Sequence, residues 1–151
     1  MTPAAIATDL ISQFSSADFP ATLAAYADQL SLEVLRELAD RISRALSRKP
    51  GQALILAQVA QAVAERLGDP FAQAMALNFL AAAHNHSGDL PQALALSRQA
   101  EAAFQACQQP LRVTSVKINR VATLRNMGRY AEAIALAAEA RAEYQALGDP
   151  R

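Results

Sequence analysis

The sequence predicts an all-α protein, a right-handed solenoid of antiparallel helix pairs with about eight helices. The chain contains 36 alanines, and alanine is the strongest helix former. Three segments, 51–70, 91–110 and 131–150, repeat one pattern at a period of 40 residues. Such a period is typical of stacked units that bury their apolar faces against one another. The residues that coincide in this register are Ala53, Ala93 and Ala133; Leu56, Leu96 and Leu136; Ala60, Ala100 and Ala140; Pro70, Pro110 and Pro150.

The first thirty residues match the repeat poorly and are predicted to form an N-terminal cap, residues 1–30. Thr2 and Pro3 suit the N-cap and first turn of a helix over 3–15. Asp18 is expected to cap a second helix over 19–29, or one that runs on toward residue 47.

The rest of the chain is predicted to hold three helix pairs. Gly68 can end a helix in the left-handed conformation, Asp69 can cap the next one, and Pro70 suits its first turn. Only the proline remains at Gln108, Gln109 and Pro110, so a looser junction is expected there. The predicted units are 31–70, a degenerate repeat, and 71–110 and 111–150, two fuller ones, with helices over 31–47, 51–67, 70–86, 90–107, 110–127 and 131–147.

The last residues carry the start signal of another helix. We therefore expect the array to continue beyond residue 151 in a longer parent protein, or the chain to assemble through the helix over 131–147. In the second case Ile134 and Ala138 are the expected self-association residues.

The two fuller units resemble the tetratricopeptide repeat (TPR). That family has glycine at the turn between its two helices, with alanines five and twelve residues later, and large, large, small and aromatic positions in its first helix. The 40-residue period resembles the long TPR variant found in bacterial signalling proteins, including those with a CHAT protease, an NTPase or a transcription-factor domain. The matching residues are Gly88, Leu90, Ala93 and Ala100; Gly128, Tyr130, Ala133 and Ala140; and, in the first helix, Leu77, Leu80, Ala81 and His84.

Two residues depart from this pattern. Lys117 and Arg120 stand where the preceding unit has Leu77 and Leu80. We expect that helix either to rotate or to leave the two charges partly exposed.

The resemblance implies that the first helices line a concave surface that holds a peptide or protein partner. Asparagine can pair with a peptide backbone as donor and acceptor, and arginine can bind a carboxylate with two hydrogen bonds. The alternative is that these first helices simply present an ordinary solvent-exposed face there. The expected lining residues are Met75, Asn78, Asn85, Ser115, Ile118 and Arg125.

Other kinds of site are not predicted. Fourteen basic residues balance fourteen acidic ones, which indicates neither a nucleic-acid nor a membrane partner. Cys107 stands alone, and His84 and His86 are two residues apart, so they do not share a helix face. We therefore expect no catalytic residues, no metal, no cofactor and, by default, a cytoplasmic location.

Three functions remain open. The favoured one is a non-catalytic scaffold or adaptor that binds a peptide or protein on its concave surface. The second is the N-terminal regulatory or sensor arm of a larger bacterial signalling enzyme. The third is a structural module that forms homo-oligomers through its last helix.

Overall fold

A computed structural model describes residues 1–148, so Asp149 and Pro150 of the repeat pattern lie outside it. These residues form an all-helical repeat solenoid. Its helices are α1 (Pro3–Gln13), α2 (Phe19–Ala25), α3 (Leu32–Ala45), α4 (Pro50–Leu67), α5 (Pro70–Ser87), α6 (Leu90–Ala106), α7 (Pro110–Asn126) and α8 (Tyr130–Ala146).

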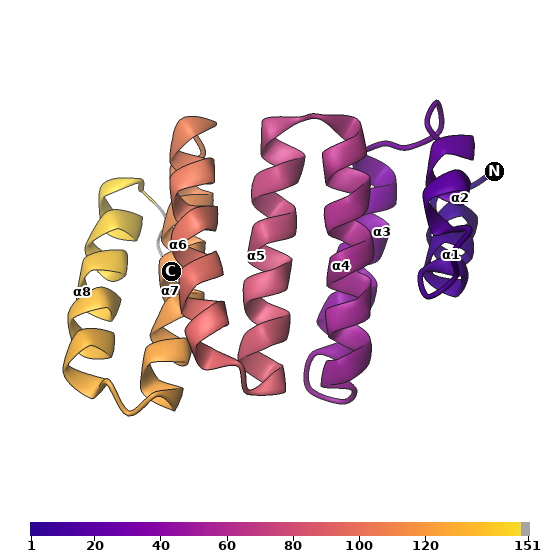
Figure 1. The fold of residues 1–151 in the computed structure, drawn as a ribbon. Helices are drawn as coiled ribbons and strands as arrows, with labels where there is room; N and C mark the ends of the chain where they lie inside the picture. Colours follow the sequence, from indigo (N-terminus) through magenta and orange to yellow (C-terminus); the bar gives the residue numbers. More distant parts are fainter. Residues whose placement is uncertain (149–151) are drawn as a thin grey trace.

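The helices stand in a row from α1 at one end to α8 at the other (Figure 1). Each packs chiefly on its neighbours in the chain. We call α3, α5 and α7 the first helices and α4, α6 and α8 the second helices. Each first helix also contacts the next first helix along the row, α3 with α5 and α5 with α7. Within residues 1–148, successive second helices contact one another less. The first helices therefore form the more crowded, inner side of the row.

The junction between α4 and α5 has the predicted chemistry. Gly68 ends α4 with a φ of 65°, and its N–H donates to the Ala64 carbonyl. The Asp69 carboxylate accepts from the Phe71 N–H, and Pro70 occupies the first turn. At the equivalent junction one unit later, between α6 and α7, Gln108 takes the same left-handed conformation, with a φ of 57°, and no side chain caps α7. This junction therefore lacks both the glycine and the cap.

The N-terminal region differs from the prediction in two ways. The Thr2 hydroxyl accepts from the Ala5 N–H as expected, but the Asp18 carboxylate makes no capping hydrogen bond. The expectation that the second helix runs to 29, or on toward 47, is wrong because α2 ends at Ala25. A turn follows in which the Leu30 N–H donates to the Tyr26 carbonyl, and α3 starts separately.

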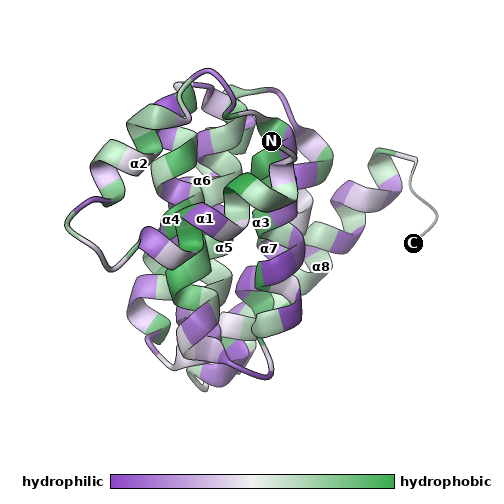
Figure 2. Ribbon diagram, turned by 90° about the vertical axis from the view of Figure 1, so that its right-hand side faces the viewer, coloured by the Kyte–Doolittle hydropathy of each residue, from purple (hydrophilic) through white to green (hydrophobic). Residues whose placement is uncertain are grey.

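The core is built from alanine and branched aliphatic side chains. Ala93, Ala100 and Ala140 are fully buried, which lets neighbouring helices approach closely. One cluster of buried residues extends from α1 to α7, and a second, small one joins α6, α7 and α8 through Leu94, Leu124 and Ala133. Hydrophobic and hydrophilic residues alternate along the helices, and α8 projects away from the rest (Figure 2). The last helix therefore shares little of the main core.

Among the described helices, none combines the length and the hydropathy needed to cross a bilayer.

Candidate interaction surfaces

A hollow lies on the side of the first helices, and we call it the inner hollow. It has a volume of about 170 Å³. The first helices α5 and α7 form most of its wall, and Leu46 at the C-cap of α3 and Ser97 of α6 complete it. Small side chains keep it open, and amide and imidazole groups supply donors and acceptors. Its lining residues are Leu46, Ala81, Ala82, Asn85, His86, Ser97, Asn119, Ala122 and Thr123.

The residues predicted for the concave surface are spread over four environments. Asn85 lines the inner hollow, where it accepts a hydrogen bond of 3.4 Å from the Asn126 amide. Met75 is only 6% exposed and belongs to the core, so it offers almost no surface to a partner. Ser115 faces α8, because its hydroxyl lies 3.0 Å from the Tyr144 hydroxyl. The other three, Asn78, Ile118 and Arg125, are half-buried or exposed and lie outside the lining of the hollow.

Asn119 and Thr123 line the inner hollow but were not predicted. Asn119 stands one residue after Ile118, which was predicted to line the concave surface. One residue is about 100° of helix rotation, so a small error in the assumed facing of α7 moves the predicted lining onto different side chains.

A cluster of five charged side chains joins α6, α7 and α8, and we call it the ion cluster. Lys117 Nζ lies 2.5 Å from both Glu139 Oε1 and Glu143 Oε1, and 3.8 Å from Glu101 Oε1. Arg120 Nη1 lies 2.6 Å from Glu101 Oε2 but is not aligned with it as a hydrogen-bond donor, so this contact is an ion pair.

The ion cluster corrects the expectation for Lys117 and Arg120. Both residues are buried, at 6% and 9% exposure, so the charges are neither turned away nor left in water. Burial is possible because glutamates on the two neighbouring second helices compensate each positive charge. The side chains of Glu101 and Glu143 are themselves half-buried, so both partners of these contacts lie largely out of water.

The pKa values in the cluster follow from these contacts. Burial acts to lower the pKa of Lys117, but the hydrogen bonds and charges of Glu139 and Glu143 outweigh it, so the pKa is raised. The hydrogen bond from Lys117 lowers the pKa of Glu139, with the charge of Lys117 adding to the effect. Each partner therefore holds the other in its charged form.

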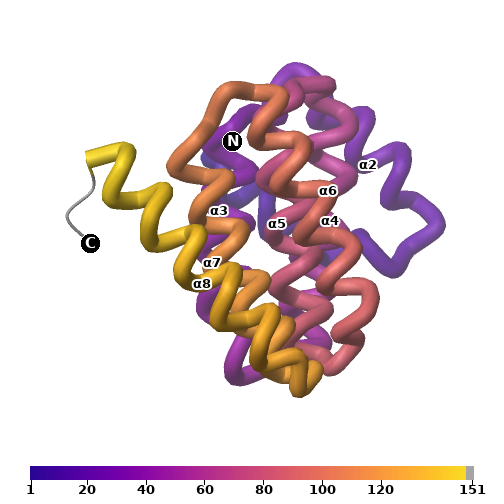
Figure 3. The backbone as a smooth tube through the Cα atoms, turned by 90° about the vertical axis from the view of Figure 1, so that its left-hand side faces the viewer, coloured from indigo at the N-terminus to yellow at the C-terminus, as the bar shows by residue number. Residues whose placement is uncertain are grey.

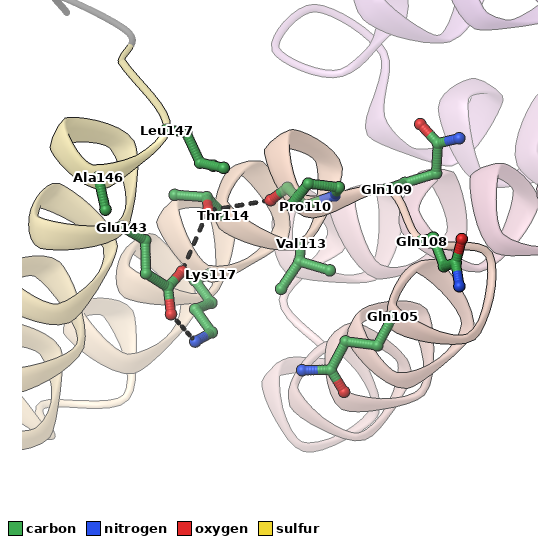
Figure 4. A pocket seen from close by; sticks show the side chains of 10 residues that line it. All are labelled: Gln105, Gln108, Gln109, Pro110, Val113, Thr114, Lys117, Glu143, Ala146 and Leu147. Carbon is green, nitrogen blue, oxygen red and sulfur yellow. Dashed lines mark hydrogen bonds and ion pairs between the residues drawn. The ribbon is translucent and has the colours of Figure 1, made fainter.

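A groove of about 400 Å³ opens beside the ion cluster, and we call it the α8 groove (Figure 4). Glu143 reaches from α8 toward α7, where it accepts from Thr114 Oγ1 at 3.0 Å and from Lys117. The Thr114 hydroxyl also lies 3.1 Å from the Pro110 carbonyl. Both charged groups in the groove are thus already paired. Its lining residues are Gln105, Gln108, Gln109, Pro110, Val113, Thr114, Lys117, Glu143, Ala146 and Leu147.

The outer face of α8 carries exposed apolar residues. Ile134 is 71% exposed and Tyr130 is 62% exposed. Leu94, which stands forty residues before Ile134, is only 7% exposed because α7 covers it. Ala138, the other predicted self-association residue, is also exposed. This face of a second helix is therefore covered in the preceding unit and uncovered in α8.

The two histidines lie near the end of α5, and the cysteine follows α6. His84 Nδ1 lies 3.6 Å from an Asp89 carboxylate oxygen, and His86 Nδ1 lies 2.9 Å from the Ala82 carbonyl. Cys107 is half-buried at the end of α6. Among residues 1–148, no three histidine, cysteine or acidic side chains are grouped so that they could hold a metal ion.

Comparison with protein-family models, with curated proteins and with solved structures finds no match to this chain. The case for each candidate surface therefore comes from its own geometry and chemistry.

Proposed function

We propose that the protein is a non-catalytic interaction module of the TPR type, which holds a short peptide segment of a partner protein in the inner hollow. The observation that carries this proposal is that the first helices α5 and α7, with Leu46 at the C-cap of α3, line one accessible hollow. A surface that is already formed costs little reorganisation on binding. The resemblance of the repeat to the TPR pattern adds an argument by analogy.

The chemistry of the hollow suits a peptide backbone. Asn85 and Asn119 each have an amide that can donate and accept. Ala82 and Ala122 leave room between the helices for a small apolar side chain. Binding would therefore combine backbone pairing with a shallow apolar contact.

A displayed peptide library tests the proposal. Peptides selected on the parent protein are expected to lose binding to the variant Ala122→Trp, because the indole fills the hollow. The matched control is Ala102→Trp, at an exposed position of α6 that does not line it. Enriched peptides that bind both variants as tightly as the parent would show that the hollow is not the binding site, and so would a failure to enrich any peptide.

A second candidate is self-association through α8, favoured by the exposure of Ile134. Burying a branched aliphatic side chain of this size contributes about 1.5–3 kcal/mol. A charge at this position would therefore disrupt a contact between two copies.

Sedimentation of the variant Ile134→Glu tests this candidate, with Ala138→Glu as a second variant. Both are expected to turn oligomers into monomers. The control is Ile55→Glu, since Ile55 is a 39% exposed isoleucine of α4. A mass unchanged from the parent in both α8 variants would exclude this function.

A further inference from the structure

A second hollow, which we call the basic hollow, lies where α1, α3 and α4 meet. It has a volume of about 320 Å³. Four of its lining residues are cations, Arg41, Arg44, Arg48 and Lys49, and none is acidic. The remaining lining residues are Ile11, Ala45, Gln52 and Leu56, which are apolar or neutral.

Most of this positive charge is not paired within the described chain. Arg41 is held by Glu37 at 2.8 Å and donates to the Ala4 carbonyl at 3.0 Å. Arg44, Arg48 and Lys49 are exposed, and within residues 1–148 none of them has a carboxylate within 4.0 Å.

The acidic side chains of α3 and α1 do not line the basic hollow. Glu37 is engaged by Arg41. Asp9 of α1 accepts a hydrogen bond of 2.5 Å from the Tyr26 hydroxyl. Asp40 is exposed and lies within no ion pair of the described chain. The basic hollow therefore keeps an excess of positive charge.

The end of α3 accounts for part of this arrangement. Cations near a helix C-terminus are favoured by the helix dipole. The dipole does not explain why the cations surround a hollow whose wall includes the apolar side chains of Ile11 and Leu56. Arginine binds carboxylates with paired hydrogen bonds, and an apolar wall accepts an aliphatic side chain.

We propose that the basic hollow binds an acidic segment of a partner protein in which carboxylates flank an apolar side chain. Arg44, Arg48 and Lys49 bind the carboxylates, and the apolar side chain lies against Ile11, which is half-buried. This site shares no lining residue with the inner hollow, so it does not depend on the function proposed there.

Fluorescence anisotropy tests the proposal with a labelled pentapeptide in which two glutamates stand on each side of a leucine. Binding is expected, and it should weaken as salt is raised because the contacts are between charges. The double variant Arg44→Gln with Arg48→Gln is expected to lose about tenfold or more in affinity. The control pair Arg66→Gln with Arg98→Gln removes two exposed arginines outside the hollow and should bind as the parent does.

Further probes distinguish other ligands. The same peptide with glutamines in place of glutamates should not bind, and inorganic phosphate at equal ionic strength should compete no better than chloride. Equal binding of the neutral peptide, equal loss in the control pair, or undiminished binding by the double variant would overturn the proposal. Tighter binding of a single-stranded RNA than of the acidic peptide would overturn it as well.

Discussion

Replacing Lys117 with methionine is expected to weaken the attachment of α8. The side chain of Lys117 is 7% exposed, whereas those of Glu139 and Glu143 are 56% and 33% exposed. Removing one partner of a fully buried ion pair costs about 3–5 kcal/mol. Because the two glutamates can turn toward water, we expect a smaller loss of about 2 kcal/mol.

A double variant separates the cost of an unpaired charge from the value of the ion pair. Lys117→Leu with Glu143→Ala introduces the residue types that stand forty positions earlier, at Leu77 and Ala103. Replacing a buried ion pair by apolar residues is often neutral or stabilising. The double variant is therefore expected to lie within about 1 kcal/mol of the parent.

Urea unfolding followed by circular dichroism measures both changes, and hydrogen exchange of the α8 amides locates them. Arg36→Met is the control, because it removes an exposed ion pair with Glu33 and should change stability by less than about 0.5 kcal/mol. Parent-like stability in Lys117→Met, or a double variant as unstable as the single one, would refute the reasoning.

Three further predictions concern other parts of the chain. Gln108→Gly should raise the melting temperature by stabilising the left-handed residue by about 0.5–1 kcal/mol, and an unchanged or lower value would count against a strained junction. Phe104→Ala should cost about 3–5 kcal/mol in urea unfolding, since Phe104 is 1% exposed and packs edge-to-face on Phe71; a cost below that of an average surface change would contradict this. The attachment of α8 should weaken as the pH falls below about 4.5, because Glu139, whose folded pKa is lowered, then becomes protonated. It should also weaken as the pH rises past 10.5 and through the raised pKa of Lys117, because the lysine then loses its charge. Exchange of the α8 amides across that range measures the effect, and a flat acid limb would contradict it.

The repeat and its punctuation could be predicted from the sequence because they depend on local chemistry. Gly68 and Asp69 act within a few residues of their own position, and the period of 40 places each helix. The early end of α2 could not be predicted because it depends on packing against α1, where the Tyr26 hydroxyl donates to Asp9.

The ion cluster could not be predicted in the same way. Lys117 and its partners Glu139 and Glu143 are 22 and 26 residues apart in sequence. Within its own helix, Lys117 occupies a position that is leucine in the preceding unit, and no residue of that helix indicates what its partners are. The compensation becomes visible only when two helices are placed side by side.

The oblique position of α8 has a mechanical consequence (Figure 3). Within residues 1–148 this helix is held chiefly by α7, through a small apolar cluster and a set of charges. Tension applied to the C-terminal end would load these contacts first and detach α8 while the larger core remained intact. Since each earlier helix also rests chiefly on its neighbours, extension would then proceed one helix at a time.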